Sequence, residues 1–100
     1  MEALKVKVSK TFLRQHDEIS EWYASQMGQK AMLKYLEDLE STIGMLVRFP
    51  QIGKLDERRT KGKREYYSFL LHPHYRIIYR FTKRTLYLIS FQATQATQMR

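Results

Sequence analysis

The chain has 100 residues and a net charge of +8 at neutral pH, with 43% hydrophobic residues, 13% aromatic residues and no cysteine. This length accommodates one domain with one core, and the apolar and aromatic content excludes a disordered chain. The lack of cysteine excludes a disulfide framework, a thiolate metal site and a cysteine nucleophile, and no apolar run is long enough to span a bilayer.

The first expected elements are a short strand and a helix. Apolar and charged residues alternate at positions 4–8, which predicts a half-buried strand. Ser9 follows as a good N-cap, and apolar residues then recur at intervals of three and four. This pattern predicts an amphipathic helix at residues 10–26 that ends near Gly28.

A second helix is expected at residues 29–48, where apolar residues again form one stripe. Pro50 and Gly53 end this helix and open a loop. The large apolar side chains of the two helices are interpreted as core between helices and sheet. The alternative is a partly exposed groove for a partner's helix. These residues are Phe12, Trp22, Tyr23, Met27, Met32 and Met45.

Three strands are expected in the second half of the chain, at residues 64–71, 75–81 and 85–91. The short gaps between them require antiparallel pairing of neighbours, because a parallel return needs a longer crossover. The first strand must also join the sheet, but the sequence does not identify its partner.

The predicted fold class is α+β, in the order β-α-α-β-β-β. It has two layers, with a helical hairpin packed on a mostly antiparallel sheet. Residues 1–92 form a single domain in this interpretation, and residues 93–100 form a polar C-terminal tail.

Positive charge is concentrated in one part of the chain. Residues 1–47 carry a net charge of −1, whereas residues 48–84 carry +8. This asymmetry indicates a surface for an anionic partner such as nucleic acid, a phosphate-bearing ligand or an acidic protein segment. We expect one positive surface that faces away from the helices, built by Arg58, Arg59, Lys61, Lys63, Arg64, Arg76 and Arg80.

The segment from His72 to His74 contains proline between two histidines, which is typical of a turn between strands. An acid–base role for either histidine is the alternative, because imidazole titrates near physiological pH. Tyr66, Tyr67 and Tyr87 are interpreted as packing residues, with base stacking as the alternative. No metal site and no cofactor are predicted.

The sequence resembles the RelE/ParE superfamily of toxins from type II toxin–antitoxin systems. The resemblance covers nearly the whole chain and rests on the element order, on Phe49-Pro-Gln-Ile-Gly53, on Arg64-Glu65 and on Tyr75-Arg-Ile-Ile-Tyr-Arg-Phe81. It implies a small cytoplasmic protein neutralised by an antitoxin. RelE-like members cleave mRNA on the ribosome, and ParE-like members inhibit DNA gyrase.

The RNA-cleaving branch is matched only in part. Arg76 corresponds to the superfamily arginine and is the candidate catalytic residue, with His72 and His74 as further candidates. The lysines that some RNA-cleaving members carry on the preceding strand fall near Tyr67 and Phe69. In many relatives the last strand runs into a segment with the pattern apolar-His/Asp-x-Arg. Here that segment is Phe91-Gln-Ala-Thr-Gln95, which has the neutral residues Gln92 and Gln95 and no arginine or acid.

The resemblance therefore favours a ParE-like toxin that binds a macromolecular target such as DNA gyrase. Two alternatives remain: a ribosome-dependent mRNA endoribonuclease, and an inactive binding module with the toxin fold. The expected partner is an acidic antitoxin, in a hetero-oligomer with the toxin, and no membrane association is expected.

Overall fold

The structure is a computed structural model that describes residues 4–72 and 75–93. The described chain forms two long helices and a five-stranded sheet. In chain order the elements are β1 (Lys5–Val8), α1 (Lys10–Trp22), a π-helical turn (Tyr23–Met27), α2 (Gln29–Arg48), a 3-10 turn (Pro50–Ile52), β2 (Lys54–Leu55), β3 (Tyr67–His72), β4 (Tyr75–Phe81) and β5 (Thr85–Ala93).

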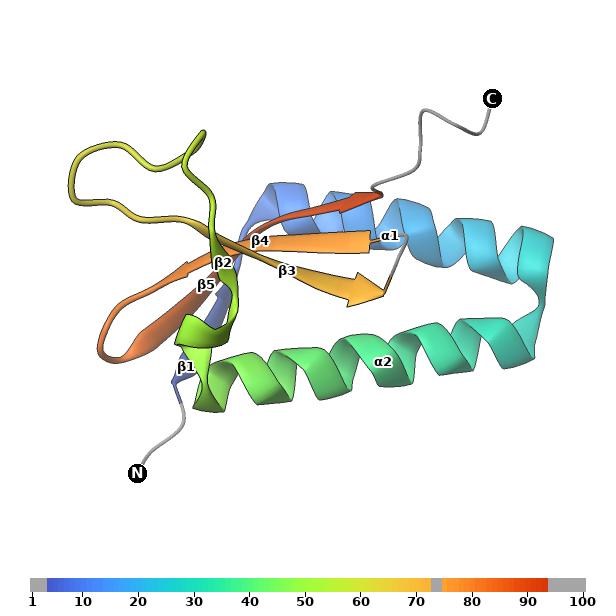
Figure 1. Ribbon diagram of the computed structural model, residues 1–100. Helices are drawn as coiled ribbons and strands as arrows, with labels where there is room; N and C mark the ends of the chain where they lie inside the picture. Colours follow the sequence, from blue (N-terminus) through green and yellow to red (C-terminus); the bar gives the residue numbers. More distant parts are fainter. Residues whose placement is uncertain (1–3, 73–74, 94–100) are drawn as a thin grey trace.

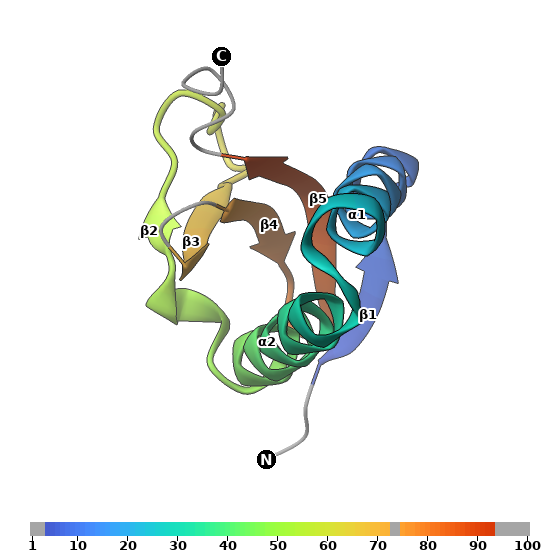
Figure 2. The same cartoon turned by 90° about the vertical axis from the view of Figure 1, so that its right-hand side faces the viewer.

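The two helices form a hairpin against one face of a curved sheet, as Figures 1 and 2 show. The strand order is β1-β5-β4-β3-β2. Neighbouring pairs are antiparallel except β1 and β5, which run parallel. The predicted α+β class and mostly antiparallel sheet are therefore confirmed, and β5 is the partner of the first strand.

Helix α1 begins where the sequence predicts. The Ser9 side chain accepts a hydrogen bond from the Phe12 backbone N–H at 3.0 Å, which satisfies one of the free donors of the first turn. The regular α-helix ends earlier than expected, at Trp22, and continues as the π-helical turn. A π-turn adds a residue to the helical repeat, so the side chains after it leave the buried stripe.

This change of repeat accompanies an error in the predicted core. Met27, the last residue of the π-helical turn, is 52% exposed. Trp22, at the end of the regular helix, is 44% exposed and packs edge-on against Tyr23. Phe12 is buried as predicted. The other three predicted core residues, Tyr23, Met32 and Met45, are half-buried.

The core lies between the hairpin and the inner face of β3, β4 and β5. Tyr35, Leu39 and Leu46 of α2 are buried against apolar side chains of the strands. Aromatic rings fill its centre, with Tyr35 stacked on Tyr23 at 4.9 Å between ring centroids. The strands contribute Tyr75, Ile77, Tyr79, Leu86, Leu88 and Phe91.

The strand predicted at residues 64–71 differs at its start. Residues 64–66 precede β3, which begins at Tyr67, and the two-residue strand β2 was not predicted. Lys54 pairs with Ser68 and Leu55 with Tyr67, so the segment after α2 forms the last strand of the sheet. His74 and residues 94–100 of the predicted tail lie outside the described residues.

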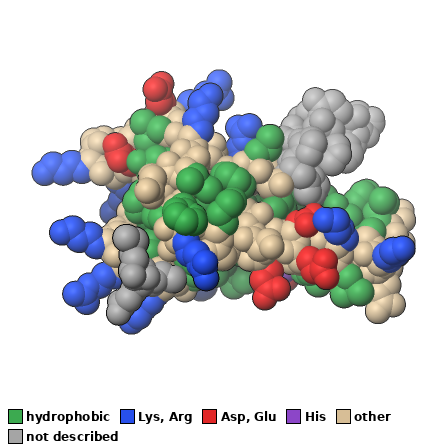
Figure 3. Space-filling model, turned by 60° about the horizontal axis from the view of Figure 1, so that its bottom comes forward, with side chains coloured by type: hydrophobic (Ala, Val, Ile, Leu, Met, Phe, Trp, Pro, Cys, Tyr) green, Lys and Arg blue, Asp and Glu red, His purple; other side chains and the backbone are tan. Residues whose placement is uncertain are grey.

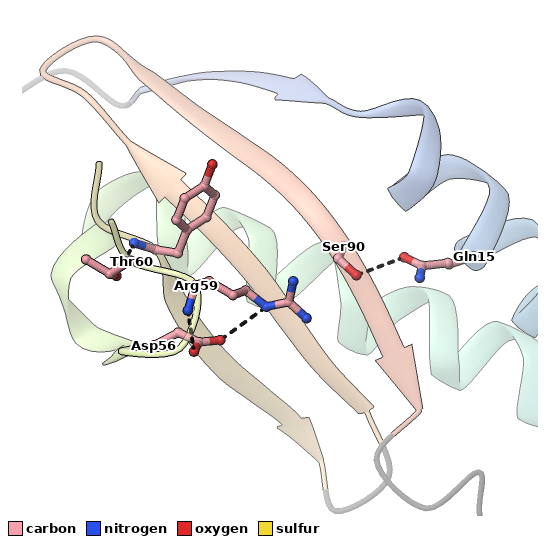
Figure 4. Close-up of polar contacts among 6 residues, drawn as sticks. Gln15, Asp56, Arg59, Thr60 and Ser90 are labelled. Carbon is pink, nitrogen blue, oxygen red and sulfur yellow. Dashed lines mark hydrogen bonds and ion pairs between the residues drawn. The ribbon is translucent and has the colours of Figure 1, made fainter. Parts of the chain in front are cut away.

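Helix α1 continues the edge of the sheet after β1 ends. Ser9 donates its hydroxyl hydrogen to the Ile89 carbonyl at 2.6 Å. In α1, the Gln15 side-chain oxygen accepts a hydrogen bond from Phe91 N–H at 2.6 Å. It also accepts one from the Ser90 hydroxyl at 3.2 Å, which Figure 4 shows. The side chains of the N-cap Ser9 and of Gln15 in α1 thus replace the backbone partners that a longer β1 would have supplied to β5.

Candidate functional site: a cationic hollow on the outer face of the sheet

A hollow of about 700 Å³ lies where the segment after β2 folds over the sheet. None of its described lining residues comes from a helix, so it opens on the face away from the hairpin. Its walls are Lys54, Leu55, Asp56, Glu57, Arg58 and Arg59 from β2 and the following loop, and Ser68, Arg76, Ile78 and Gln92 from the three central strands.

The strand alternation of β4 places Arg76 in this hollow. Tyr75, Ile77 and Tyr79 point into the core, so Arg76 and Ile78 point to the opposite face. Ile78 is only 1% exposed although it is outside the main core, which indicates that the loop covers this part of the outer face. The Arg76 side chain remains exposed.

Asp56 organises the loop that forms the other wall. Its backbone carbonyl accepts hydrogen bonds from Arg59 N–H at 3.3 Å and from Thr60 N–H at 3.0 Å. Its carboxylate also forms an ion pair with the Arg59 guanidinium at 3.3 Å (Figure 4). This pair sets the position of Arg59 beside the strands and partly neutralises its charge.

The described lining of the hollow has a positive balance. It includes four cationic side chains (Lys54, Arg58, Arg59 and Arg76) against two carboxylates (Asp56 and Glu57). Ser68 and Gln92 add a hydroxyl and a neutral amide that can donate hydrogen bonds. Such a set of donors suits a phosphate or a carboxylate.

The start of the loop is fixed from the core by Tyr79. Its hydroxyl donates to the Pro50 carbonyl at 2.6 Å and accepts from Gly53 N–H at 3.0 Å. A Cβ atom at Gly53 would lie 2.8 Å from the Ser68 carbonyl oxygen and would also collide with the Tyr79 hydroxyl. The Pro50-x-x-Gly53 segment and the tyrosine of β4 are therefore parts of one contact, although 26 residues separate Gly53 from Tyr79.

The remaining residues of the predicted basic surface do not line the hollow. Lys61 and Arg64 form a backbone bridge around a turn in which Gly62 has φ of 60°, and Lys63 lies in that turn. Arg80 covers the ring of Tyr87, with 4.3 Å between its guanidinium carbon and the ring centroid. The structure thus brings Arg58, Arg59 and Arg76 together and places the other four cations elsewhere.

No histidine is among the described lining residues of the hollow. His72 ends β3, and His74 lies outside the described residues. Within residues 4–72 and 75–93, no three histidine or acidic side chains lie close enough together to hold a metal ion. The described lining therefore offers cations and hydrogen-bond donors for binding an anion, with Asp56 and Glu57 as its titratable acids.

Part of the lining could not be identified from the sequence. Lys54, Ser68 and Ile78 carry no local signal for the site, because their approach depends on the pairing of β2 with β3 and on the folding of the loop over the sheet. In the sequence, Gln92 stands out only as a neutral residue at a position that is charged in many relatives. Its pairing with Arg76 across β4 and β5 is what brings it to the hollow.

This fold is found in solved toxin structures. The chain matches a structure described as the chromosomal ParDE TA system from P. aeruginosa with a TM-score of 0.71 and 14% identity, covering 91% of this chain and 96% of that chain. It matches a chain of the E. coli DinJ–YafQ toxin–antitoxin complex with a TM-score of 0.61 and 12% identity, covering 99% and 100% of the two chains.

A third match is the YoeB dimer from Staphylococcus aureus, with a TM-score of 0.51 and 19% identity, covering 91% of this chain and 97% of that chain. Among curated proteins, none matches the chain. At these identities the structural likeness defines the fold, which is that of the RelE/ParE class of small α+β proteins.

The sequence itself identifies the family. A family model described as the ParE toxin of the type II toxin–antitoxin system, parDE, matches residues 6–92. The chain therefore belongs to the ParE toxin family, and the predicted membership of the RelE/ParE superfamily is confirmed. No helix within the described residues is both long enough and apolar enough to cross a membrane.

Proposed function

We propose that this toxin arrests growth by binding a macromolecular target such as DNA gyrase through the cationic hollow. The observation that carries the proposal is the convergence of Arg58, Arg59 and Arg76 on a wall of rigid strands. These cations can hold an anionic group of the target, and the described lining offers no histidine for proton transfer.

The test of this proposal is induction of the chain alone, followed by growth and gyrase measurements. We expect arrest with DNA damage signalling and inhibition of purified gyrase. Arg76→Gln should weaken gyrase inhibition by about tenfold, which corresponds to roughly 1.4 kcal/mol of binding free energy. Arg14→Gln on the exposed side of α1 removes the same charge and should have no effect. Normal supercoiling by gyrase at saturating toxin would refute the proposed target.

The alternative function is that of a ribosome-dependent mRNA endoribonuclease. It is favoured by the presence of Arg58 and Arg76 in the lining of one hollow, because two cations at one site can stabilise a pentavalent phosphate. Cleaved transcripts without DNA damage would establish this alternative. Arrest that survives both Arg76→Gln and the triple change Lys54→Gln, Arg58→Gln and Arg59→Gln would mean that neither activity uses this hollow.

A third possibility is a binding module that has no remaining toxicity, and induction without arrest would select it. If the non-toxic chain still binds the antitoxin, that result would support the binding-module function.

The proposed partner is an acidic antitoxin that covers the toxin in the cytoplasm, as part of a system that can stabilise a plasmid. The charge of +8 supports an acidic partner, and exposed apolar residues such as Trp22 and Leu33 on the hairpin offer contacts for it. Native mass spectrometry of the chain co-expressed with the neighbouring gene should give a hetero-oligomer. A free toxin in that experiment would contradict the proposed partner.

A further inference from the structure

A second cationic surface is formed at the end of the sheet that carries the turn between β4 and β5. The strand register aligns Lys7 of β1 with Tyr87 of β5, and Tyr87 with Arg80 of β4. Residues that are paired across strands share a face, so these three side chains form one row. The row lies on the outer face, because the strand neighbours of Tyr87 (Leu86 and Leu88) and of Arg80 (Tyr79) are buried in the core.

Three further cations lie beside this row, two in the turn and one at the start of β1. Thr82 holds the turn together, because its hydroxyl oxygen accepts hydrogen bonds from Arg84 N–H at 3.3 Å and from Thr85 N–H at 3.1 Å. The Arg84 carbonyl accepts a hydrogen bond from Lys5 N–H at 2.9 Å, which ties the turn to the start of β1. We call the resulting set the turn-end cluster: Lys5, Lys7, Arg80, Lys83 and Arg84.

Within the described part of the chain, no acidic side chain forms an ion pair with a cation of the turn-end cluster. Both ion pairs found there, Lys34–Asp38 and Arg59–Asp56, involve other residues. The backbones of Lys7 and Arg80, at the two ends of the row, are about 10 Å apart, since two strand spacings separate them. Like charges this close repel one another, and an anionic partner would relieve the repulsion. Figure 3 shows basic side chains projecting from this end of the molecule, whereas charges of both signs are mixed over the hairpin.

We propose that the turn-end cluster binds the phosphate backbone of duplex DNA. An acidic protein segment would need apolar anchors beside the cations. The apolar side chains of β1, Val6 and Val8, are exposed, but they alternate with Lys5 and Lys7 and so do not share the face of the cluster. Single strands bind through free aromatic platforms on which bases stack. The aromatic ring in the row, Tyr87, is already covered by Arg80. Cations held on strands and on a tight turn are suited to sequence-independent phosphate contacts.

The experiment uses the purified full-length chain and a short labelled duplex of mixed sequence, with fluorescence anisotropy measured at several salt concentrations. We expect binding that weakens with salt. The triple variant Lys7→Gln, Lys83→Gln and Arg84→Gln should make the negative slope of log K against log salt shallower by about 0.9 for each phosphate that the variant no longer neutralises. Its affinity at low salt should fall by about tenfold or more.

The matched control is the triple variant Arg14→Gln, Lys30→Gln and Lys34→Gln, which removes the same charge from exposed positions on the helices. It should bind the duplex with nearly the affinity of the parent chain. Equal losses of affinity in the two triple variants would refute the cluster as the binding surface, since only net charge would then matter. Tighter binding of the single strand would refute the duplex assignment, and absence of duplex binding would refute the proposal as a whole. Growth arrest is scored separately, so this result is independent of the proposed gyrase target.

Discussion

At the scale of single residues, the tyrosine of β4 connects the core to the hollow. Tyr79 is fully buried, and its hydroxyl satisfies the carbonyl of Pro50 and the N–H of Gly53 at the start of the loop. A buried backbone group that loses its partner costs about 1–3 kcal/mol. The wall of the hollow therefore depends on a residue that does not line it.

Tyr79→Phe is expected to lower the free energy of unfolding by about 1–3 kcal/mol, because it leaves both backbone groups without the hydroxyl. Urea denaturation followed by circular dichroism measures this change. The control is Tyr67→Phe, whose hydroxyl donates to the exposed Glu65 carboxylate at 3.2 Å. That variant should lose less than about 1 kcal/mol. Equal losses in the two variants would contradict the role given to Tyr79.

Two glycine substitutions should have opposite effects on stability. Gly53→Ala places a methyl group against the Tyr79 hydroxyl and the Ser68 carbonyl, so it should destabilise the fold by about 1–3 kcal/mol. Gly44→Ala lies in the interior of α2 with open space around the new Cβ. It should stabilise the fold by up to about 1 kcal/mol, since alanine is the better helix former. Thermal denaturation of both variants measures the two signs, and a neutral Gly53→Ala would show that the loop can shift.

At the scale of secondary-structure elements, the contact between α1 and β5 replaces part of the sheet. Strand β1 pairs with β5 only as far as Leu88, and the described strand β5 runs to Ala93. Ser9 and Gln15 supply partners for backbone groups of β5 beyond that point. A helix side chain therefore completes the sheet edge.

Gln15→Leu removes the side-chain oxygen that accepts the Phe91 N–H hydrogen bond, and it should therefore destabilise this edge of the sheet. The Phe91 N–H would remain buried without an acceptor, and we expect a loss of about 1–3 kcal/mol of unfolding free energy. Hydrogen exchange at the Phe91 amide should become faster relative to the Ile77 amide of β4. Gln15→Glu retains an acceptor oxygen and should keep more of the protection at Phe91. Unchanged exchange in Gln15→Leu would exclude a role for α1 in holding this edge.

At the scale of the whole molecule, buried tyrosines determine the response to alkaline pH. Burial raises the pKa of Tyr79 to about 12, partly offset by the hydrogen bond from Gly53. Burial also raises the pKa of Tyr35 and of Tyr75. In the unfolded chain these groups ionise near pH 10. Above that pH the unfolded state binds fewer protons than the folded state, so stability falls.

The free energy of unfolding should therefore show no pH dependence from these tyrosines below about pH 10. Above that pH, it should decrease by up to about 1.4 kcal/mol per pH unit for each buried tyrosine. For Tyr79 this range ends near pH 12, where the folded-state group ionises. Denaturation at a series of pH values, combined with absorbance titration of tyrosinate, tests the slope. Tyr79→Phe should make it shallower, and an unchanged slope would contradict burial as the cause.

The sequence by itself determined the helices, the antiparallel meander, the α+β class and the family. These features follow from local patterns: the helical repeat of α2, the cap at Ser9 and the short gaps between the last three strands. The positions of Arg58 and Arg76 could also be anticipated as basic and as facing away from the helices.

Only the tertiary structure decided how distant segments meet. The parallel pairing of β1 with β5, the pairing of β2 with β3, and the contact of Gly53 with Tyr79 join residues far apart in the chain. The exposure of Met27 follows a π-turn that the helical repeat did not reveal. Local patterns fix which face of an element is apolar, but the neighbours of that element depend on pairing and packing, and these decide the lining of the hollow.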